Sequence, residues 1–300
     1  MTAPHPRTAR VSAPRDAGRL GLLDPRTAAW RADLADIALA GLVGAPAYAA
    51  PVLRSNQGAA AVVHAAPADG SVAVSELLPG EDFAVLEDSG GWCWGWSVHD
   101  HYVGFVPAAA LGAAAVPTHM VGPGDALLFR APDIKAAVAS VLPAGSRLVA
   151  LPTDVPGFHA GGGGFVHHRH LLRLAGEQTL DWVAVAEGFR GAPYRWGGRT
   201  RAGIDCSGLV QVARMVAGRP TRRDSDMQAA NARPVPRAQA RRGDIACWPG
   251  HIGVLLDAET LLHATAFHMA VVVEPLATVE ARMDGATAAD LRRFPEPAAA

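Results

Sequence analysis

The chain is poor in cysteine and has no excess of charge of either sign. Cys93, Cys206 and Cys247 are the only cysteines in 300 residues. Their wide spacing suits neither a disulfide framework nor a structural zinc site. Lys and Arg together number 27 against 28 Asp and Glu, so no basic surface is expected to attract nucleic acid. The composition therefore predicts a protein of a reducing compartment that binds no nucleic acid.

Long uninterrupted apolar runs are also missing. Residues 1–20 contain Pro and Arg throughout and lack the apolar core of a secretory signal. The uncharged stretch at 37–53 is broken by glycines and prolines and is too short to cross a bilayer as a helix. We therefore expect no membrane span and a cytoplasmic location.

The chain does have enough apolar material for several folded units. Hydrophobic residues make up 50% of it, and a length of 300 residues suits two or three domains. Changes in texture divide it into an N-terminal arm with a helix (1–50), a first small β-barrel (51–112), a second small β-barrel (113–175) and an α+β domain (176–300). The helix of the arm is expected to start at Asp24-Pro25, because Trp30, Leu34 and Ile37 follow at helical spacing.

The two barrels are predicted from short β-like runs separated by turn residues. The runs are 60–63, 83–86, 92–96 and 102–106 in the first unit, and 126–130, 148–151 and 164–166 in the second. Four glycines at 161–164 are not followed by a Lys-Ser/Thr pair or by a helical pattern. They therefore indicate a hairpin turn rather than a phosphate-binding loop.

The last domain is predicted to open with helices and to continue with strands. Thr179 can cap a first helix that runs to Gly188. A second helix is expected to begin at Asp205-Cys206 and to end before Gly218. The runs 245–248, 251–256, 261–264 and 271–273 then predict a sheet.

Cys206 is the strongest candidate for a chemical role. It stands at the first turn of a predicted helix, where unpaired N–H groups and the helix dipole lower the pKa of a thiol. A buried structural cysteine is the alternative, and it is the preferred interpretation of Cys93 and Cys247. A thiol nucleophile needs a base, and the base needs an orienting partner. His251 and His263 lie on two predicted strands and can supply both, although a structural histidine is the simpler interpretation of either one alone.

Four sequence elements occur in order around these residues. They are Pro-Tyr-Arg-Trp-Gly-Gly at 193–198, Asp-Cys-Ser-Gly-Leu-Val at 205–210, Gly-Asp at 243–244 and His-Ile-Gly at 251–253. The series resembles the NlpC-type cysteine peptidases of bacterial cell-wall metabolism. The resemblance implies a papain-like fold with Cys206 as nucleophile, His251 as base and His263 as orienting residue. It also implies that the Tyr194 hydroxyl and the backbone N–H of Cys206 stabilise the oxyanion.

The two upstream barrels make the resemblance more specific, because they indicate a subfamily. The runs 91–94 and 100–106 are similar to bacterial SH3-like domains. Two such barrels before the peptidase domain resemble the γ-D-glutamyl-L-diamino acid endopeptidases (dipeptidyl-peptidase VI). Those enzymes cleave stem peptides that have a free N-terminal L-alanine, between γ-D-glutamate and a diamino acid such as meso-diaminopimelate. The first barrel walls off their groove and holds the free amine with an acidic residue and a tyrosine; the resemblance assigns these places to Glu81, with Glu76 as the alternative, and to Tyr102.

The resemblance also concerns residues beside the nucleophile. Asp224-Ser225 matches an Asp-Ser pair of that subfamily and would bind the amine, since a desolvated ammonium group needs a carboxylate partner. A polar turn that caps the next helix is the alternative. Asp205 and Ser207 are expected to line the pocket for the substrate backbone, although Asp205 can equally cap the cysteine helix. Arg222 stands where the family often has proline, and the motif stays readable.

The histidines His167, His168 and His170 have no Cys or carboxylate at ligand spacing. We therefore expect surface residues there and no metal site.

The sequence thus predicts an α+β cysteine peptidase: a papain-like NlpC-type domain preceded by two small SH3-like β-barrels and an N-terminal helix. It would use no metal or organic cofactor, bind a muropeptide, and release L-Ala-γ-D-Glu in the recycling of cell-wall peptides. No protein partner is inferred. Two other functions stay open, an exported hydrolase that acts on intact wall and a non-catalytic muropeptide-binding protein.

Overall fold

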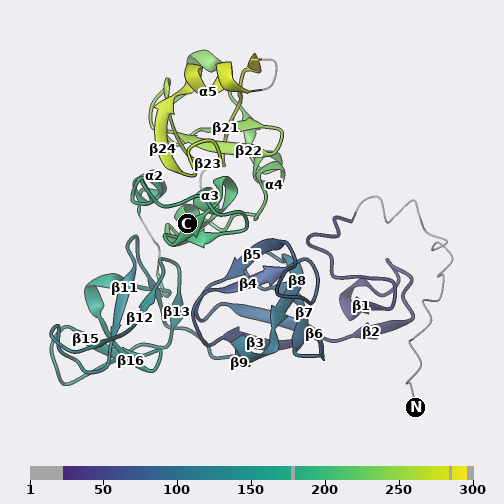
Figure 1. Cartoon of the computed structure of the whole chain (residues 1–300), viewed down its shortest axis with the longest axis vertical. Coiled ribbons are helices and arrows are strands. Elements are labelled where there is room, and N and C mark those ends of the chain that lie inside the picture. The colour runs from purple at the N-terminus through teal and green to yellow at the C-terminus, as the bar shows by residue number, and fades with distance from the viewer. Residues whose placement is uncertain (1–22, 177–179, 284–285, 296–300) are drawn as a thin grey trace.

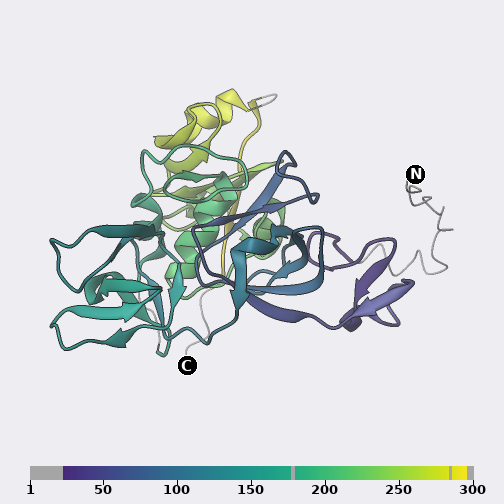
Figure 2. The ribbon, with the colours of Figure 1, turned by 60° about the horizontal axis from the view of Figure 1, so that its bottom comes forward.

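The computed structural model describes residues 23–176, 180–283 and 286–295. Figure 1 shows the first barrel at the centre, the second barrel at the lower left, and the α+β domain above them. Figure 2, a turned view, shows the α+β domain standing over both barrels. In the described part of the chain, no helix has the length and apolar character that crossing a membrane requires.

The N-terminal arm lies on the first barrel and does not form the predicted helix. Between residues 23 and 50 the structure has no α-helix, only a 3-10 turn (Ile37–Leu39) and two parallel strands, β1 (Leu34–Asp36) and β2 (Ala47–Ala49). Ala29 packs with Leu86 and Trp94 of the barrel, and Val103 donates its backbone N–H to the carbonyl of Arg26 at 2.8 Å. The prediction of a helix was therefore wrong: these barrel contacts outweigh the weak preference of a short segment for helix.

The first barrel is a seven-stranded antiparallel sheet in the order β5-β4-β8-β7-β6-β3-β9. Its strands are β3 (Val52–Asn56), β4 (Ala61–His64), β5 (Ala73–Leu77), β6 (Asp82–Ser89), β7 (Trp92–Ser97), β8 (Val103–Pro107) and β9 (Leu111–Ala113). Val63, Leu77, Phe83 and Cys93 fill its core. Cys93 thus has the buried apolar surroundings of a structural cysteine.

The second barrel consists of two sheets, β13-β10-β17 and β12-β11-β16-β15-β14. Its strands are β10 (His119–Val121), β11 (Ala126–Phe129), β12 (Val138–Leu142), β13 (Arg147–Leu148), β14 (Leu151–Pro152), β15 (Phe158–Gly161), β16 (Gly164–His167) and β17 (Leu171–Arg173). Gly162 and Gly163, with φ of +63° and +80°, make the turn between β15 and β16. This confirms the predicted hairpin, because two positive φ values suit a two-residue loop.

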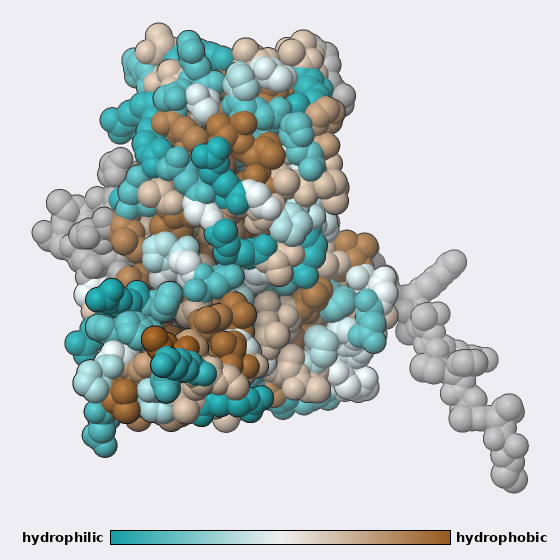
Figure 3. Space-filling model, turned by 60° about the vertical axis from the view of Figure 1, so that its left-hand side comes forward, coloured by the Kyte–Doolittle hydropathy of each residue, from teal (hydrophilic) through white to brown (hydrophobic). Residues whose placement is uncertain are grey.

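The second barrel also leaves apolar side chains in contact with solvent. Leu127 and Val141 lie opposite each other on β11 and β12 and are 43% and 50% exposed. Figure 3 shows brown apolar patches among teal polar side chains over the face of the molecule that includes this region.

The α+β domain has the predicted order, helices first and sheet after. Its elements are α2 (Trp182–Glu187), β18 (Arg199–Thr200), β19 (Gly203–Ile204), α3 (Cys206–Val216), α4 (Ser225–Ala230), β20 (Arg233–Pro234), β21 (Ile245–Trp248), β22 (His251–Leu255), β23 (Thr260–Thr265), β24 (Ala270–Pro275), α5 (Leu276–Arg282) and β25 (Asp290–Arg293). The main sheet is antiparallel in the order β20-β25-β21-β22-β23-β24. Asp181 caps α2, and the predicted cap Thr179 lies outside the described residues.

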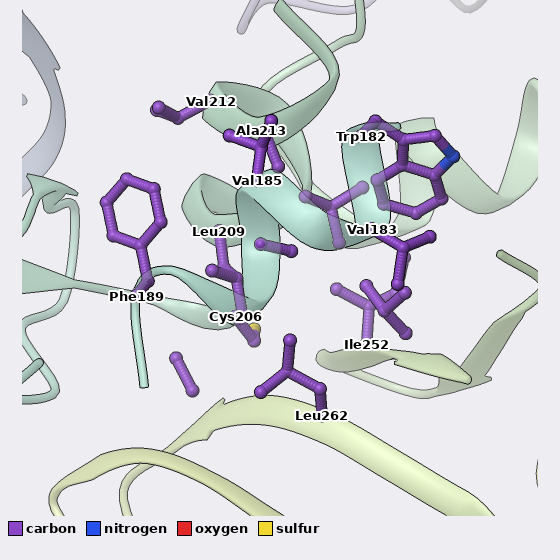
Figure 4. Packing of buried hydrophobic residues seen from close by; sticks show 14 of the residues in the cluster. Trp182, Val183, Val185, Phe189, Cys206, Leu209, Val212, Ala213, Ile252 and Leu262 are labelled. Atoms are coloured by element: carbon purple, nitrogen blue, oxygen red, sulfur yellow. The ribbon is translucent and has the colours of Figure 1, made fainter. Parts of the chain in front are cut away.

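Helix α3 forms the centre of this domain, and all of its residues are buried. Figure 4 shows Leu209 and Val212 of α3 among Val185 of α2, Ile252 of β22 and Leu262 of β23. This packing fixes the first turn of α3 against the strands that carry the two predicted catalytic histidines.

Candidate active site

Cys206 is the first residue of α3, as predicted. Its helix begins there because Asp205 is extended, with φ of −95° and ψ of 177°, and its Oδ1 accepts the N–H of Gly208 at 2.7 Å. Figure 4 places Cys206 at the end of α3, near Ile252 and Leu262. Burial, followed by the charge of Asp205, raises the pKa of the Cys206 thiol to about 11. The expected lowering of this pKa was therefore wrong for the resting protein, since desolvation outweighs the helix N-terminus.

His251, His263 and Glu274 form a hydrogen-bonded row across β22, β23 and β24. His251 Nε2 lies 2.8 Å from His263 Nδ1, and His263 Nε2 lies 2.9 Å from Glu274 Oε2. Arg282 donates to both carboxylate oxygens of Glu274, at 2.8 and 2.7 Å, and holds the pKa of Glu274 well below its usual range. The carboxylate can therefore only accept.

This row fixes the tautomers of both histidines. An acceptor at Glu274 requires a proton on Nε2 of His263, so His263 Nδ1 accepts the Nε2–H of His251. Nδ1 of His251 then carries no proton and is able to take one from a thiol. Burial, followed by the neighbouring His263, lowers the pKa of His251 to about 4, so the ring is neutral near pH 7.

Glu274 was missed by the sequence analysis. The predicted strand 271–273 stopped one residue short of it, whereas β24 includes it. Val272 pairs with His263 in the observed register. Glu274 is two residues further along β24, on the same face, and within diagonal reach of His263. The signal that could have found Glu274 is the alternation of the strand, because one more residue would have added a carboxylate on this face.

Tyr194 lies between the start of β24 and the cysteine helix. Its backbone N–H donates to the Met269 carbonyl at 2.9 Å, and the residue bridges to Ile204. Burial, with added effects of Cys206 and Asp205, raises the pKa of Tyr194 to about 12. The phenol therefore stays protonated and able to donate near Cys206, which is what an oxyanion requires.

A cavity of about 340 Å³ opens at Cys206. It is lined by Arg26, Val72, Val74, Tyr102, Trp196, Asp205, Cys206, Ser207, Asp224, Ser225, Asp226 and Gly250. The structure thus gathers Cys206 and five of the predicted substrate-binding residues around one space. Gly250, which directly precedes His251, belongs to the same wall.

Asp205 and Ser207 are held in this wall by the buried guanidinium of Arg223. Arg223 donates from Nη1 and Nη2 to the two oxygens of Asp205, at 2.9 and 2.6 Å, and from Nη1 to Ser207 Oγ at 2.9 Å. Its Nε donates across the domain boundary to Ser75 Oγ of the first barrel at 3.1 Å. Asp205 therefore caps the helix and lines the cavity at the same time.

Asp224 binds the first barrel and does not cap α4. It occupies the N-cap position, but its side chain makes no capping hydrogen bond. Its Oδ2 instead accepts from the Tyr102 hydroxyl at 2.9 Å and from Arg26 Nη1 at 2.9 Å. The alternative of a capping turn is therefore wrong. Burial raises the pKa of Asp224, and burial together with the Asp224 charge raises that of Tyr102.

The expectation for Glu81 has to be corrected. Its carboxylate is fully buried and binds Arg199 of β18, at 2.6 Å to Nη1 and 3.0 Å to Nη2. The alternative, Glu76, is also buried and accepts the backbone N–H of Arg199 and a side-chain hydrogen bond from Arg195. Neither residue lines the cavity, because both are engaged in joining the first barrel to the α+β domain.

The histidine cluster lies on the second barrel, away from this cavity. His167 ends β16, and His168 and His170 are exposed in the 3-10 turn after it. Within residues 23–176, 180–283 and 286–295, no group of His, Cys, Asp and Glu side chains is arranged to hold a metal ion.

Comparisons with known proteins agree with this geometry. Residues 191–283 match the NlpC/P60 family, and residues 63–111 match the bacterial dipeptidyl-peptidase SH3 domain. Dipeptidyl-peptidase 6 of Lysinibacillus sphaericus is 26% identical over 49% of this chain and 60% of its own length. A probable endopeptidase of Mycobacterium tuberculosis is 33% identical over 29% of this chain, and the match spans 23% of that protein. The chain thus covers 60% or less of the length of these two relatives.

Solved structures give the same fold. An NlpC/P60 family protein from Bacillus cereus superimposes with a TM-score of 0.69 over 82% of this chain and 100% of that protein, at 18% identity. An NlpC/P60 endopeptidase from Photobacterium damselae subsp. piscicida superimposes with a TM-score of 0.56 over 81% of this chain and 74% of its own, at 14% identity. The cysteine helix, its histidine strands and the upstream barrel are therefore those of an NlpC/P60 domain with a papain-like fold, preceded by an SH3 domain of the bacterial dipeptidyl-peptidase type.

Proposed function

We propose that the protein is a cysteine peptidase that cuts the bond between γ-D-glutamate and the diamino acid in short cell-wall stem peptides with a free N-terminal L-alanine. The observation that carries this proposal is the contact of Asp224 with Tyr102 in the wall of the Cys206 cavity. It puts a carboxylate for an ammonium group and a nucleophile in the same space. A peptide bound by its amine at one end would present a bond near its start to the thiol.

The chemistry follows from the tautomers of the histidine row. His251 Nδ1 takes the proton of Cys206, and the sulfur attacks the γ-carbonyl carbon of D-glutamate. The Tyr194 hydroxyl and the backbone N–H of Cys206 donate to the oxyanion that forms. The protonated His251 gives its proton to the leaving amine of the diamino acid, and an acyl-enzyme remains. Water, deprotonated by His251, then attacks the acyl carbon and releases L-Ala-γ-D-Glu.

The amine end explains why a free terminus would be required. An ammonium group that leaves water needs a charged partner. Asp224 is a partly buried carboxylate of the cavity, whereas both oxygens of the more deeply buried Asp205 are bound by Arg223. An acylated amine has no charge, so it gives the Oδ1 atom of Asp224 no ionic partner in exchange for its lost hydration. Such a substrate should bind poorly.

The proposed role is the turnover of soluble wall peptides in the cytoplasm. A reducing compartment suits a thiol nucleophile and a chain in which Cys93, Cys206 and Cys247 are all free. A hydrolase of intact wall is the competing role. Release of peptides from purified sacculi at a rate comparable to that from the soluble peptide would favour that competitor.

The test is mass spectrometry of L-Ala-γ-D-Glu-meso-diaminopimelate incubated with the protein, with Cys206→Ala, and with Cys247→Ala as the matched control in the same domain. We expect L-Ala-γ-D-Glu from the wild type and from Cys247→Ala, and none from Cys206→Ala. Failure of the wild type to cleave, with the peptide still bound, would instead support a non-catalytic muropeptide-binding protein.

A further inference from the structure

Arg26 carries the N-terminal arm into the cavity. Its carbonyl is held by the N–H of Val103 on β8, directly after Tyr102, and its guanidinium reaches the start of α4. Figure 1 shows the purple arm beside β8, on the side of the barrel that faces α4. Arg26 thus lies at the amine end of the cavity, where the arm, the first barrel and the α+β domain meet.

The guanidinium is fully engaged by three carboxylates. Nη1 donates to Asp224 Oδ2 and Asp226 Oδ1, each at 2.9 Å, and Nη2 donates to Asp226 Oδ2 and Asp24 Oδ2, each at 2.7 Å. Nε donates to Asp24 Oδ1 at 3.0 Å. All five N–H bonds of the group are used, so Arg26 offers no donor to a ligand carboxylate.

Asp224 nevertheless keeps one oxygen for a ligand. Tyr102 and Arg26 both donate to Oδ2, and within the described residues no hydrogen bond reaches Oδ1. Two fixed donors on the same oxygen set the rotamer of Asp224. Oδ1 is the atom left to accept an ammonium group.

We propose that Arg26 determines specificity at the amine end of the cavity. It positions Asp224 and, with the arm behind it, closes the space beyond a bound ammonium group, so that a peptide with one more residue at its amino end does not fit. The inference rests on the proposed function. The inference goes beyond the proposed function because it assigns closure of the amine end of the cavity to the arm upstream of the SH3 domain, and not to the first barrel alone.

The experiment compares Arg26→Ala, Arg26→Lys and the control Arg31→Ala. Arg31 lies on the same arm and pairs with Asp33 and Glu87, but it does not line the cavity. Steady-state kinetics are measured on L-Ala-γ-D-Glu-meso-diaminopimelate and on the same peptide with an added N-terminal glycine. Circular dichroism melting confirms that each variant is folded.

For Arg26→Ala we expect KM on the free tripeptide to rise about tenfold, with kcat within about twofold, because one charge-assisted hydrogen bond to Asp224 is lost. The ratio of kcat/KM for the glycine-extended peptide to that for the tripeptide should rise. Arg26→Lys should have a KM between those of Arg26→Ala and the wild type, and Arg31→Ala should have the kinetics of the wild type.

Unchanged KM and unchanged ratio in a folded Arg26→Ala would overturn the inference. So would a lower KM for the tripeptide, which would mean that the guanidinium competes with the amine. In both cases the wild type still cleaves the tripeptide, and the proposed function survives. A wild type that cleaves neither peptide removes the proposed function, and this inference with it.

Discussion

The two barrels are built from the same kind of short antiparallel strands, yet they meet the α+β domain in opposite ways. The first barrel contacts it through buried polar and charged groups and supplies Tyr102 to the cavity. The second barrel contacts it through small apolar residues near the other end of α3. The difference shows that one barrel is part of the site while the other supports the helix that carries Cys206.

The first barrel makes its polar contacts with α3 and β18 of the α+β domain. Asp100 accepts from Gln211 Nε2 at 2.8 Å, and Glu81 binds both terminal nitrogens of Arg199. Because these groups are buried, their geometry must be satisfied in full, which fixes the barrel in one position on the domain.

The contact of the second barrel is apolar and close. Ala144 belongs to the core cluster of the α+β domain. The next residue, Gly145, has φ of +89°, and a Cβ there would collide with the methyl group of Met215 on α3. Such a contact stabilises the end of the helix and brings no side chain to the cavity.

The largest expected effect is on stability, from breaking the ion pair of the first barrel. Arg199→Ala leaves Glu81 buried without its cation, which should lower the free energy of unfolding by about 3–5 kcal/mol. Arg54→Ala is the control, since its pair with Asp88 on the same barrel is partly exposed on both sides and should contribute about 1 kcal/mol or less. Urea unfolding measures both. Equal losses would contradict the assignment of the buried pair as the anchor.

The next effect is on substrate binding. Asp224→Asn removes the charge that faces the amine and should lower kcat/KM on the free-amine tripeptide by about thirtyfold, mainly through KM. Asp154→Asn, an exposed carboxylate of the second barrel, should leave the kinetics unchanged. A similar loss for both variants would mean that overall charge, rather than this site, governs binding.

Gly145→Ala should lower the stability of the protein without changing its substrate binding. The added methyl group meets Met215, and the positive φ disfavours alanine, so the free energy of unfolding should fall by about 1–3 kcal/mol. KM should stay within about twofold of the wild type. Thermal melting and steady-state kinetics test this; a large rise in KM would show that the second barrel also shapes the cavity.

Smaller effects are expected for the histidines of the two regions, and they are seen in the pH profile. His251 has its pKa lowered to about 4, so it stays unprotonated and able to act as a base down to about that pH. Activity should therefore persist at pH 5–6, where an ordinary histidine is largely protonated. A pH profile of kcat/KM for the wild type and for His168→Ala of the second barrel should show the same acid limb. A midpoint near pH 6.5 would contradict a lowered pKa for His251.

The Glu274 contact predicts a change in the same profile. The carboxylate raises the pKa of His251 by its charge, so Glu274→Gln should move the acid limb to lower pH. It should also lower kcat roughly fivefold, because the tautomer of His263 is no longer fixed. Loss of activity at all pH values without a shift would indicate only a disturbed sheet.

Local sequence signals predicted the centre of the site well. Cys206 at a helix start and the strands of His251 and His263 depend on short-range patterns, and the structure has them at the predicted places. Asp224 and Tyr102 came from the family resemblance, and the structure puts them in contact.

The errors lie where distant segments meet. Arg26 binds Asp224 across 198 positions in sequence, and the arm follows the barrel instead of its own helical pattern. The assignment of Glu81 to the amine site was wrong because its carboxylate binds Arg199, 118 positions away. Nothing near Glu81 in the sequence indicates this pairing. Long-range ion pairs of this kind produce no local periodicity from which they could be predicted.

The most direct test of the central claim is a comparison of two substrates with the wild-type protein. L-Ala-γ-D-Glu-meso-diaminopimelate and its N-acetylated copy are incubated in parallel, and release of diaminopimelate is followed by mass spectrometry. If Asp224 and Tyr102 form an amine site at the closed end of the Cys206 cavity, only the free-amine peptide is cleaved. Cleavage of both peptides at similar rates would keep the peptidase and contradict the amine site; cleavage of neither would contradict the peptidase itself.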